Sequence, residues 1–197
     1  MIMTLPNKLT SIRIVMIPVF IVLFYVPLFG INNYLLTGLF ILAGLTDWFD
    51  GYLARRLEMQ SEFGAFLDPV ADKLMVSMVL VLLVSAHPGW LLAIPATVII
   101  GRELTISAVR EWMAKLGERA KVAVSIIGKF KTTAQMVAIG FLLFEDPIAG
   151  LPTLQIGYVL LYLAAILTLW SMYLYLQAAW PSLSSTTRQD EEDKTTT

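Results

Sequence analysis

The chain has 197 residues, of which 57% are hydrophobic and only 15% are charged, with a formal net charge of -1. Soluble domains carry about 25% charged residues, so this composition excludes an ordinary water-soluble enzyme and favours an integral membrane protein. No cysteine is present, which excludes disulfides and thiolate sites. The single histidine, His87, stands in a His-Pro-Gly turn and is expected to be an ordinary loop residue. No nucleic-acid partner is expected.

The apolar stretches give the fold class. A transmembrane helix needs about 20 apolar residues, and six stretches of this kind run over residues 9–29, 34–54, 62–86, 90–113, 122–144 and 154–179. We therefore predict an all-α integral membrane protein, a bundle of six transmembrane helices. Met1, Ile2, Met3 and Leu5 predict a short interfacial segment before it. Residues 1–181 are expected to form the domain, and residues 182–197, which are polar and acidic, a disordered tail.

Basic residues between the apolar stretches fall on one side of the predicted membrane. The loops near Gly30, His87 and Glu145 contain no Lys or Arg, whereas the other side carries Lys8, Arg55, Arg56, Lys115, Arg119 and Lys121. The positive-inside bias places both termini in the cytoplasm of a multi-pass protein of the cell inner membrane. The charges inside the stretches lie in the cytoplasmic halves, which predicts a polar cavity open to the cytoplasm: Arg13, Asp47, Asp50, Asp68, Asp72, Arg102, Lys129 and Lys131.

Four aspartates form the densest acidic group. Asp47 and Asp50 are spaced i, i+3 at the end of the second helix, and Asp68 and Asp72 are spaced i, i+4 at the start of the third. A short polar link joins these helices, so the four carboxylates are expected to converge. Acids inside a membrane are costly and are functional candidates by default.

The four carboxylates repel one another unless cations neutralise them. Oxygen ligands without Cys or His favour Mg²⁺ or Mn²⁺, and two such ions would balance four carboxylates. Two-metal sites commonly serve phosphoryl chemistry. The alternative is a structural ion-pair network of the aspartates with Arg55, Arg56 and Lys73. Gly51 and Gly64 flank the group, and either a ligand or a packed helix would explain them.

The spacing of these residues is similar to a known signature. The pattern Asp47-x2-Asp50-Gly51-x2-Ala54-Arg55-x8-Gly64-x3-Asp68-x3-Asp72 resembles that of the CDP-alcohol phosphatidyltransferases at every fixed position. The resemblance covers about residues 4–180 and includes the six-helix pattern. It implies an enzyme that joins an alcohol to the phosphatidyl group of CDP-diacylglycerol and releases CMP. It also implies a homodimer in contact with membrane lipids.

The resemblance implies roles for individual residues. It identifies Asp47, Asp50 and Asp68 as metal ligands, and Asp72 as the general base and a contact of the second metal. Residues expected to contact the CDP-lipid are Gly51, Arg55, Ser61, Gly64, Thr10 and Arg13.

A second charged group, on the fourth and fifth helices and the loop between them, concerns the acceptor. It comprises Arg102, Arg110, Arg119, Lys129 and Lys131. These cations either pair with Glu103 and Glu111 or bind a phosphate on the acceptor, since Arg and Lys are the usual phosphate ligands. The runs around Arg102 and Lys129 are similar to bacterial family members whose acceptor is sn-glycerol 3-phosphate, which would give phosphatidylglycerophosphate. An inositol phosphate acceptor is the alternative.

A divalent-cation transporter is the competing class, because it too would place aspartates in the membrane. A transporter is expected to carry polar groups through to the far side of its helices. The far half of every predicted helix is apolar here, which favours the enzyme. A membrane scaffold without catalysis would leave both charged groups unexplained.

Overall fold

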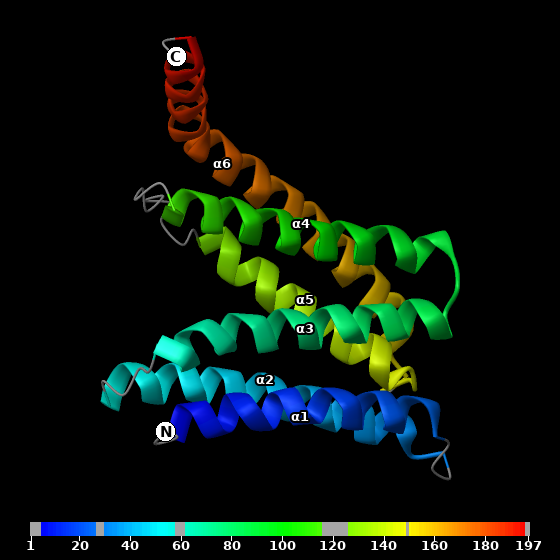
Figure 1. Cartoon of the computed structure of the whole chain (residues 1–197). Helices are drawn as coiled ribbons and strands as arrows, with labels where there is room; N and C mark the ends of the chain where they lie inside the picture. The colour runs from blue at the N-terminus through cyan, green and yellow to red at the C-terminus, as the bar shows by residue number, and fades with distance from the viewer. Residues whose placement is uncertain (1–4, 27–29, 58–61, 116–125, 149, 196–197) are drawn as a thin grey trace.

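The structure is a computed structural model. It describes the backbone of residues 5–26, 30–57, 62–115, 126–148 and 150–195, and the side chains of residues 10–26, 30–47, 49, 64, 67–115, 130–148 and 150–180. Six helices make up the described chain: α1 Leu5–Tyr25, α2 Asn32–Leu57, α3 Glu62–Ala86, α4 Trp90–Lys115, α5 Ile126–Phe144 and α6 Thr153–Thr195. The α1–α2, α3–α4 and α5–α6 connections lie at one end of the bundle, and the N-terminus lies at the other (Figure 1).

The predicted all-α bundle of six helices is confirmed. Among the described residues, three helical segments are long and apolar enough to cross a membrane: Leu67–Ala86, Trp90–Lys115 and Thr153–Trp180. Thr10–Tyr25 and Phe130–Phe144 are shorter apolar helical segments. Met1, Ile2 and Met3 of the expected interfacial segment lie outside the described residues, and Leu5 already begins α1.

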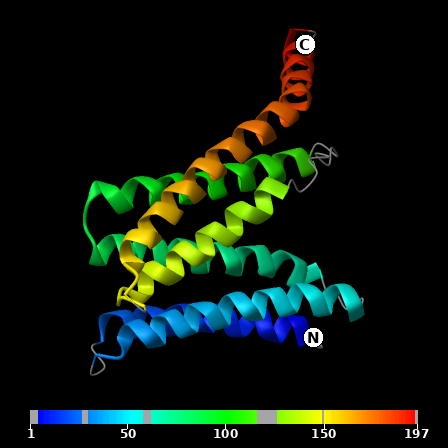
Figure 2. The same ribbon diagram turned by 180° about the vertical axis from the view of Figure 1, so that it is seen from behind.

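The C-terminal helix extends beyond the predicted boundary of the domain. We expected a disordered tail from residue 182, but α6 continues to Thr195. Figures 1 and 2 show this part of α6 projecting beyond the other helices. The division of the chain into residues 1–181 and 182–197 stays a prediction.

Helices α1 to α5 carry the polar residues of the site. Helix α1 packs against α2 and α3, α3 also packs against α4 and α5, and α5 packs against α2 and α6. A single large apolar cluster joins the helices, and its fully buried members include Phe20, Val79, Leu80, Leu92, Ile99, Ile139, Leu142 and Leu161. Lipid tails are as apolar as these side chains, so close van der Waals packing rather than exclusion of water holds such helices together.

Close approach of α5 and α6 depends on one glycine. A Cβ atom at Gly157 would lie 2.9 Å from Cγ and 3.2 Å from the backbone nitrogen of Leu142. The backbone nitrogen cannot move aside as a flexible side chain can. Gly157 therefore allows the two helices to approach where a larger residue would separate them.

A side-chain hydrogen bond joins two loops at the end of the bundle opposite the N-terminus. His87 Nε2 lies 2.7 Å from Glu145 Oε1, which links the α3–α4 turn to the α5–α6 connection. Glu145 has a φ of 60°, and the Thr153 hydroxyl donates to the backbone oxygens of Glu145 and Asp146, each at 2.9 Å. His87 is in a loop as predicted, but its acidic partner was not foreseen.

Candidate active site

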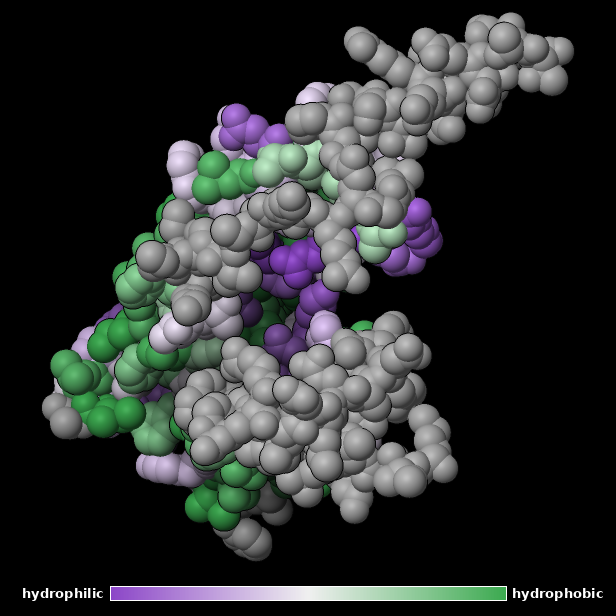
Figure 3. Space-filling view, turned by 90° about the vertical axis from the view of Figure 1, so that its left-hand side faces the viewer, coloured by the Kyte–Doolittle hydropathy of each residue, from purple (hydrophilic) through white to green (hydrophobic). Residues whose placement is uncertain are grey.

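A polar cavity lies between α3, α4 and α5. Figure 3 views the bundle from the side where the N-terminus lies in Figure 1, and it shows hydrophilic side chains gathered in a hollow. The cavity has a volume of about 170 Å³, and its polar lining residues are Asp72, Lys73, Ser77, Arg102, Glu103, Lys131, Thr132 and Gln135. Apolar side chains, among them Val76, Ile99 and Met136, complete the wall. Residues of three separate helices therefore meet in one small polar space.

Arg13 connects two of the predicted metal ligands. Its side chain is 2% exposed, and Nη1 lies 2.8 Å from Asp47 Oδ1 on α2 and 3.5 Å from Asp68 Oδ1 on α3. The Thr10 hydroxyl, one turn earlier on α1, donates to Asp68 Oδ1 at 3.1 Å. The carboxylates of Asp47 on α2 and Asp68 on α3 therefore do lie near each other, and Arg13 of α1 lies between them. Sequence reasoning assigned Thr10 and Arg13 to the CDP-lipid and missed these contacts with the aspartates.

Asp72 borders both parts of the site. It lies one turn after Asp68 on α3, lines the polar cavity and lines a second, smaller cavity together with Arg13. Among the described residues, however, no three acidic or histidine side chains form a group that could hold a metal ion. The convergence of Asp47 and Asp68 is observed, and the full metal centre stays a prediction.

Several predicted site residues cannot be placed. The side chains of Asp50, Gly51, Arg55 and Lys129, and the whole of Ser61 and Arg119, lie outside the described part of the chain. Gly64 is in the first turn of α3, one turn before Asp68. The roles assigned to these residues stay predictions.

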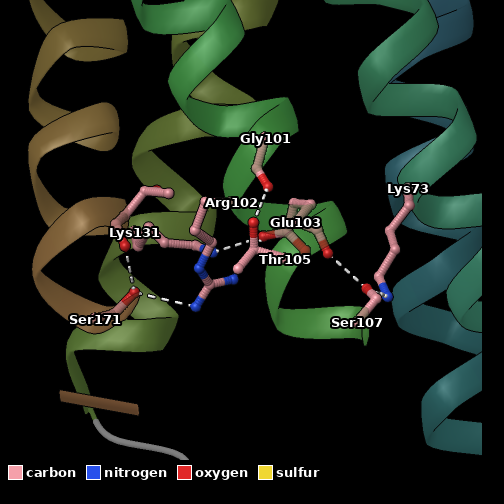
Figure 4. Close-up of polar contacts among 9 residues, drawn as sticks. Lys73, Gly101, Arg102, Glu103, Thr105, Ser107, Lys131 and Ser171 are labelled. Atoms are coloured by element: carbon pink, nitrogen blue, oxygen red, sulfur yellow. Dashed lines mark hydrogen bonds and ion pairs between the residues drawn. The ribbon is translucent and has the colours of Figure 1, made fainter. Parts of the chain in front are cut away.

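Glu103 gathers two of the predicted phosphate ligands. Its Oε1 accepts from Arg102 Nη1 at 2.7 Å and from Lys131 Nζ at 3.0 Å. Arg102 Nη2 also donates to the Ser171 hydroxyl of α6 at 3.1 Å (Figure 4). Glu103 therefore pairs with two of the cations, and their role in binding a phosphate stays a prediction.

A further cationic side chain lines the cavity besides the two that pair with Glu103. Lys73 also lines the cavity and donates to the Ser107 hydroxyl, which in turn donates to the backbone oxygen of Glu103 (Figure 4). Three cationic side chains thus face two carboxylates, those of Asp72 and Glu103. The described residues that line the cavity therefore carry an excess of positive charge, which suits an anionic ligand.

The remaining charged residues of α4 lie elsewhere. The Arg110 guanidinium lies over the ring of Tyr175, 5.6 Å from its centroid, a distance typical of a cation–π contact. Glu111, the other expected partner for the cations, pairs with Lys115 at 3.0 Å. The predicted role of Arg110 in binding the acceptor stays a prediction.

Sequence reasoning missed four residues that line the cavity, namely Lys73, Ser77, Thr132 and Gln135. Lys73 had been considered only as a partner of the aspartates. Spacing offered a usable signal, because Gln135 follows Lys131 at i, i+4 and so shares its face of α5.

An apolar groove adjoins the polar cavity. It lies between α2 and α5, has a volume of about 790 Å³ and is lined by Thr37, Phe40, Ile41, Gly44, Leu45, Thr132, Thr133, Met136, Val137, Gly140, Phe141, Phe144 and Ile148. Thr132 and Met136 also line the polar cavity, and Phe40 and Gly44 also line the small cavity beside Arg13 and Asp72. A charged pocket and a long apolar groove therefore share a wall, which suits a lipid with a charged head group.

Comparison with known proteins identifies the family. A model of the CDP-alcohol phosphatidyltransferases matches residues 3–170. The chain belongs to the CDP-alcohol phosphatidyltransferase family. The matched region contains every predicted site residue, from Thr10 to Lys131. The family consists of transferases, so the prediction of an enzyme is confirmed. The family also explains the four predicted metal-binding aspartates, which makes the competing cation transporter unnecessary.

Curated relatives are similar to this CDP-alcohol phosphatidyltransferase over nearly its whole length. The CDP-diacylglycerol–glycerol-3-phosphate 3-phosphatidyltransferase of Sodalis glossinidius (strain morsitans) is 51% identical over 90% of this chain and 95% of its own. The protein of the same name from Haemophilus influenzae is 51% identical over 91% and 95%. That from Pseudomonas fluorescens is 50% identical over 95% and 96%.

Proposed function

We propose that this protein transfers the phosphatidyl group of CDP-diacylglycerol to sn-glycerol 3-phosphate, giving phosphatidylglycerophosphate and CMP. The observation that carries the proposal is the identity of about half of all positions, over nearly the whole chain, with relatives that bear the name of this reaction. The shared wall of the charged cavity and the apolar groove supports a lipid substrate.

The acceptor occupies the polar cavity in this proposal. Its phosphate binds Arg102 and Lys131, because these side chains lie together on Glu103 and face the cavity. Arg offers a planar fork of donors and Lys a compact charge, and both are common phosphate ligands. Arg110, Arg119 and Lys129 are the further phosphate ligands of this proposal, on the grounds of the sequence alone.

Asp72 is the general base of the proposed reaction. Its carboxylate accepts the proton of the primary hydroxyl of the acceptor, and the hydroxyl oxygen attacks the phosphorus that carries diacylglycerol. A new phosphorus–oxygen bond forms as the bond from that phosphorus to the phosphate of CMP breaks. CMP leaves with the bonding electron pair, and the proton remains on Asp72.

Asp47, Asp50, Asp68 and Asp72 would hold two divalent ions. Their donors are all oxygen atoms, and the side chains of Asp47 and Asp68 are drawn together while remaining 43% and 37% exposed, so they fit Mg²⁺ or Mn²⁺. When bound, such ions would offset the charge of the diphosphate. Gly51, Arg55, Ser61, Gly64, Thr10 and Arg13 would line the nucleotide and diphosphate beside them.

The apolar groove between α2 and α5 would hold one acyl chain of CDP-diacylglycerol. Its lining is almost wholly apolar, and it meets the polar cavity at Thr132 and Met136. A lipid in this position would have its diphosphate beside the aspartates and its chain among the residues of α2 and α5.

We further propose a homodimer in the cell inner membrane with the site facing the cytoplasm, on the grounds of the family resemblance and the one-sided basic residues. The cysteine-free chain permits a background-free test, in which cysteines replace Pro88 and Lys115 in turn. In intact cells, a membrane-impermeant maleimide is expected to label the first variant only. Labelling of the Lys115 variant only would overturn the orientation. The dimer is tested by light scattering of the detergent-solubilised protein, and a measured protein mass equal to that of one chain would overturn it.

The reaction is tested by release of CMP from purified protein. We expect release with CDP-diacylglycerol, glycerol 3-phosphate and Mg²⁺ or Mn²⁺, and none after chelation. Asp72→Asn is expected to abolish turnover and leave binding of the CDP-lipid largely intact, whereas Asp146→Asn, a matched change in an exposed loop aspartate, is expected to leave turnover unchanged. Absence of CMP with every metal would rule out the reaction, and faster release with inositol phosphate would rule out the acceptor.

A further inference from the structure

Gln135 is a buried polar residue to which the proposed reaction has so far assigned no role. It lies on α5, its exposed fraction is 6%, and it lines the polar cavity. No hydrogen bond joins its amide to another described residue, and its nitrogen and oxygen are not among the fully buried side-chain atoms that lack a partner. The amide atoms are therefore open to the cavity, where either water or a bound molecule can pair with them.

The neighbours of Gln135 limit what that partner can be. Lys131 lies one turn earlier on the same face of α5, and Asp72 and Arg102 line the same cavity from α3 and α4. The neighbouring cations are suited to a phosphate, and Asp72 to the hydroxyl that reacts. Gln135 is neutral and offers two donors and an acceptor. An uncharged hydroxyl, which also donates and accepts, complements it.

We propose that the side-chain amide of Gln135 binds the C2 hydroxyl of glycerol 3-phosphate and selects acceptors that carry it. This inference rests on the proposed function. With the phosphate on Arg102 and Lys131 and the C1 hydroxyl at Asp72, the C2 hydroxyl is the remaining polar group of the acceptor. Gln135 is a specificity residue in this arrangement. It does not take part in bond making, and it fixes the orientation in which the C1 hydroxyl meets the base.

Packing is the competing explanation for Gln135. Its neighbours on α5 include the fully buried Ala138 and Ile139, so an unbranched side chain of this length would fill space even without its amide. An apolar side chain of similar volume would serve that purpose as well. The two explanations differ in one respect, since only the hydrogen bond makes the effect of a mutation depend on whether the acceptor has a C2 hydroxyl.

The test is a cycle of two enzymes and two acceptors. Gln135→Met keeps the length and volume of the side chain and removes the amide. The second acceptor is 3-hydroxypropyl phosphate, which keeps the phosphate and the primary hydroxyl and lacks the C2 hydroxyl. Values of kcat/KM are measured by release of CMP for each combination. Gln155→Met, at an exposed position on α6, is the matched control.

We expect the wild-type protein to favour glycerol 3-phosphate by about 10–100-fold, the usual effect of one buried hydrogen bond to a substrate. Gln135→Met is expected to lose about the same factor with glycerol 3-phosphate and little with the deoxy acceptor. Its preference would then fall to within about threefold, while the KM for CDP-diacylglycerol stays unchanged. Gln155→Met is expected to behave as wild type.

Equal losses with both acceptors in a folded Gln135→Met protein would show a packing role and overturn the inference. Should that variant fail to fold, Gln135→Asn keeps the amide and withdraws it by one methylene group, and a preference equal to that of wild type would overturn the inference in the same way. The same cycle with Ser77→Ala addresses the hydroxyl that α3 contributes to the cavity wall. Loss of the preference in that variant, but not in Gln135→Met, would assign the contact to Ser77 and overturn the inference. Absence of CMP release by the wild-type protein would instead refute the proposed function.

Discussion

Replacement of Arg13 by alanine tests the link between α1 and the two aspartates. The guanidinium is almost fully buried, and one of its nitrogens contacts carboxylates from two other helices. Arg13→Ala leaves those carboxylates facing each other without a cation between them. We expect the variant to be less stable than the wild-type protein, because the two negative charges repel and the three helices lose their shared contact.

The exposure of the partners sets the size of this effect. Removing one partner of a fully buried ion pair costs about 3–5 kcal/mol, whereas exposed pairs contribute about 0–1 kcal/mol. The side chains of Asp47 and Asp68 are 43% and 37% exposed, so solvent screens part of the interaction. An intermediate loss of about 2–3 kcal/mol corresponds to a fall of about 4–12 °C in the unfolding midpoint of a chain of this length.

The measurement is thermal unfolding in detergent, followed by circular dichroism. Ile12→Ala, at a neighbouring α1 position that is 52% exposed, is the control for side-chain truncation. Excess Mg²⁺ is expected to recover part of the loss in Arg13→Ala, since a divalent ion can replace the missing positive charge. A midpoint within about 1 °C of wild type would refute the reasoning, because it would mean that the contacts contribute no net stability.

Three further changes test other parts of the structure. Glu103→Gln removes the carboxylate that joins Arg102 and Lys131, and is expected to lower kcat/KM for glycerol 3-phosphate by about 10–100-fold. Glu111→Gln, in an exposed pair, is expected to change kcat/KM little. Equal effects of the two changes would contradict a role of the Glu103 contacts in acceptor binding. Gly140→Phe fills the apolar groove and is expected to raise the KM for CDP-diacylglycerol about tenfold. Gly38→Phe, at an open position outside the groove, is expected to leave this KM unchanged. An unchanged KM in Gly140→Phe would contradict binding of the acyl chain in the groove. Gly157→Ala separates α5 and α6 and is expected to lower the free energy of unfolding by about 1–3 kcal/mol, so equal stability in thermal unfolding would show that the helices can adjust.

The helices were predictable from the sequence because lipid demands long apolar runs with few interruptions. The third run was predicted at 62–86 and α3 spans Glu62–Ala86, since polar residues precede it and His87-Pro88-Gly89 ends it. The C-terminal end of α6 was not predictable in this way. Low hydrophobicity was taken to predict disorder beyond residue 181, but a polar segment can also continue an existing helix, and α6 does so.

The candidate site was predictable in composition but not in pairing. Charges inside apolar helices are costly, so Asp72, Arg102 and Lys131 stood out from sequence alone. Which charges meet depends on helix packing, and the contacts of Arg13 follow from α1 lying against both α2 and α3. Gln135 was missed because a neutral amide gives a weaker signal in an apolar run than a charge does. Only its burial and its place in the cavity wall distinguish it.

The position of Arg13 also affects how the protein is made. Chains are synthesised from the N-terminus, so α1 reaches the membrane before the helices that carry Asp47 and Asp68. Until then α1 carries a cation in its N-terminal half, where the long side chain of an arginine can still reach the interface. Its guanidinium meets the carboxylates of Asp47 and Asp68 only when α2 and α3 arrive. We therefore expect the packing of the first helix into the bundle to be coupled to that of the next two.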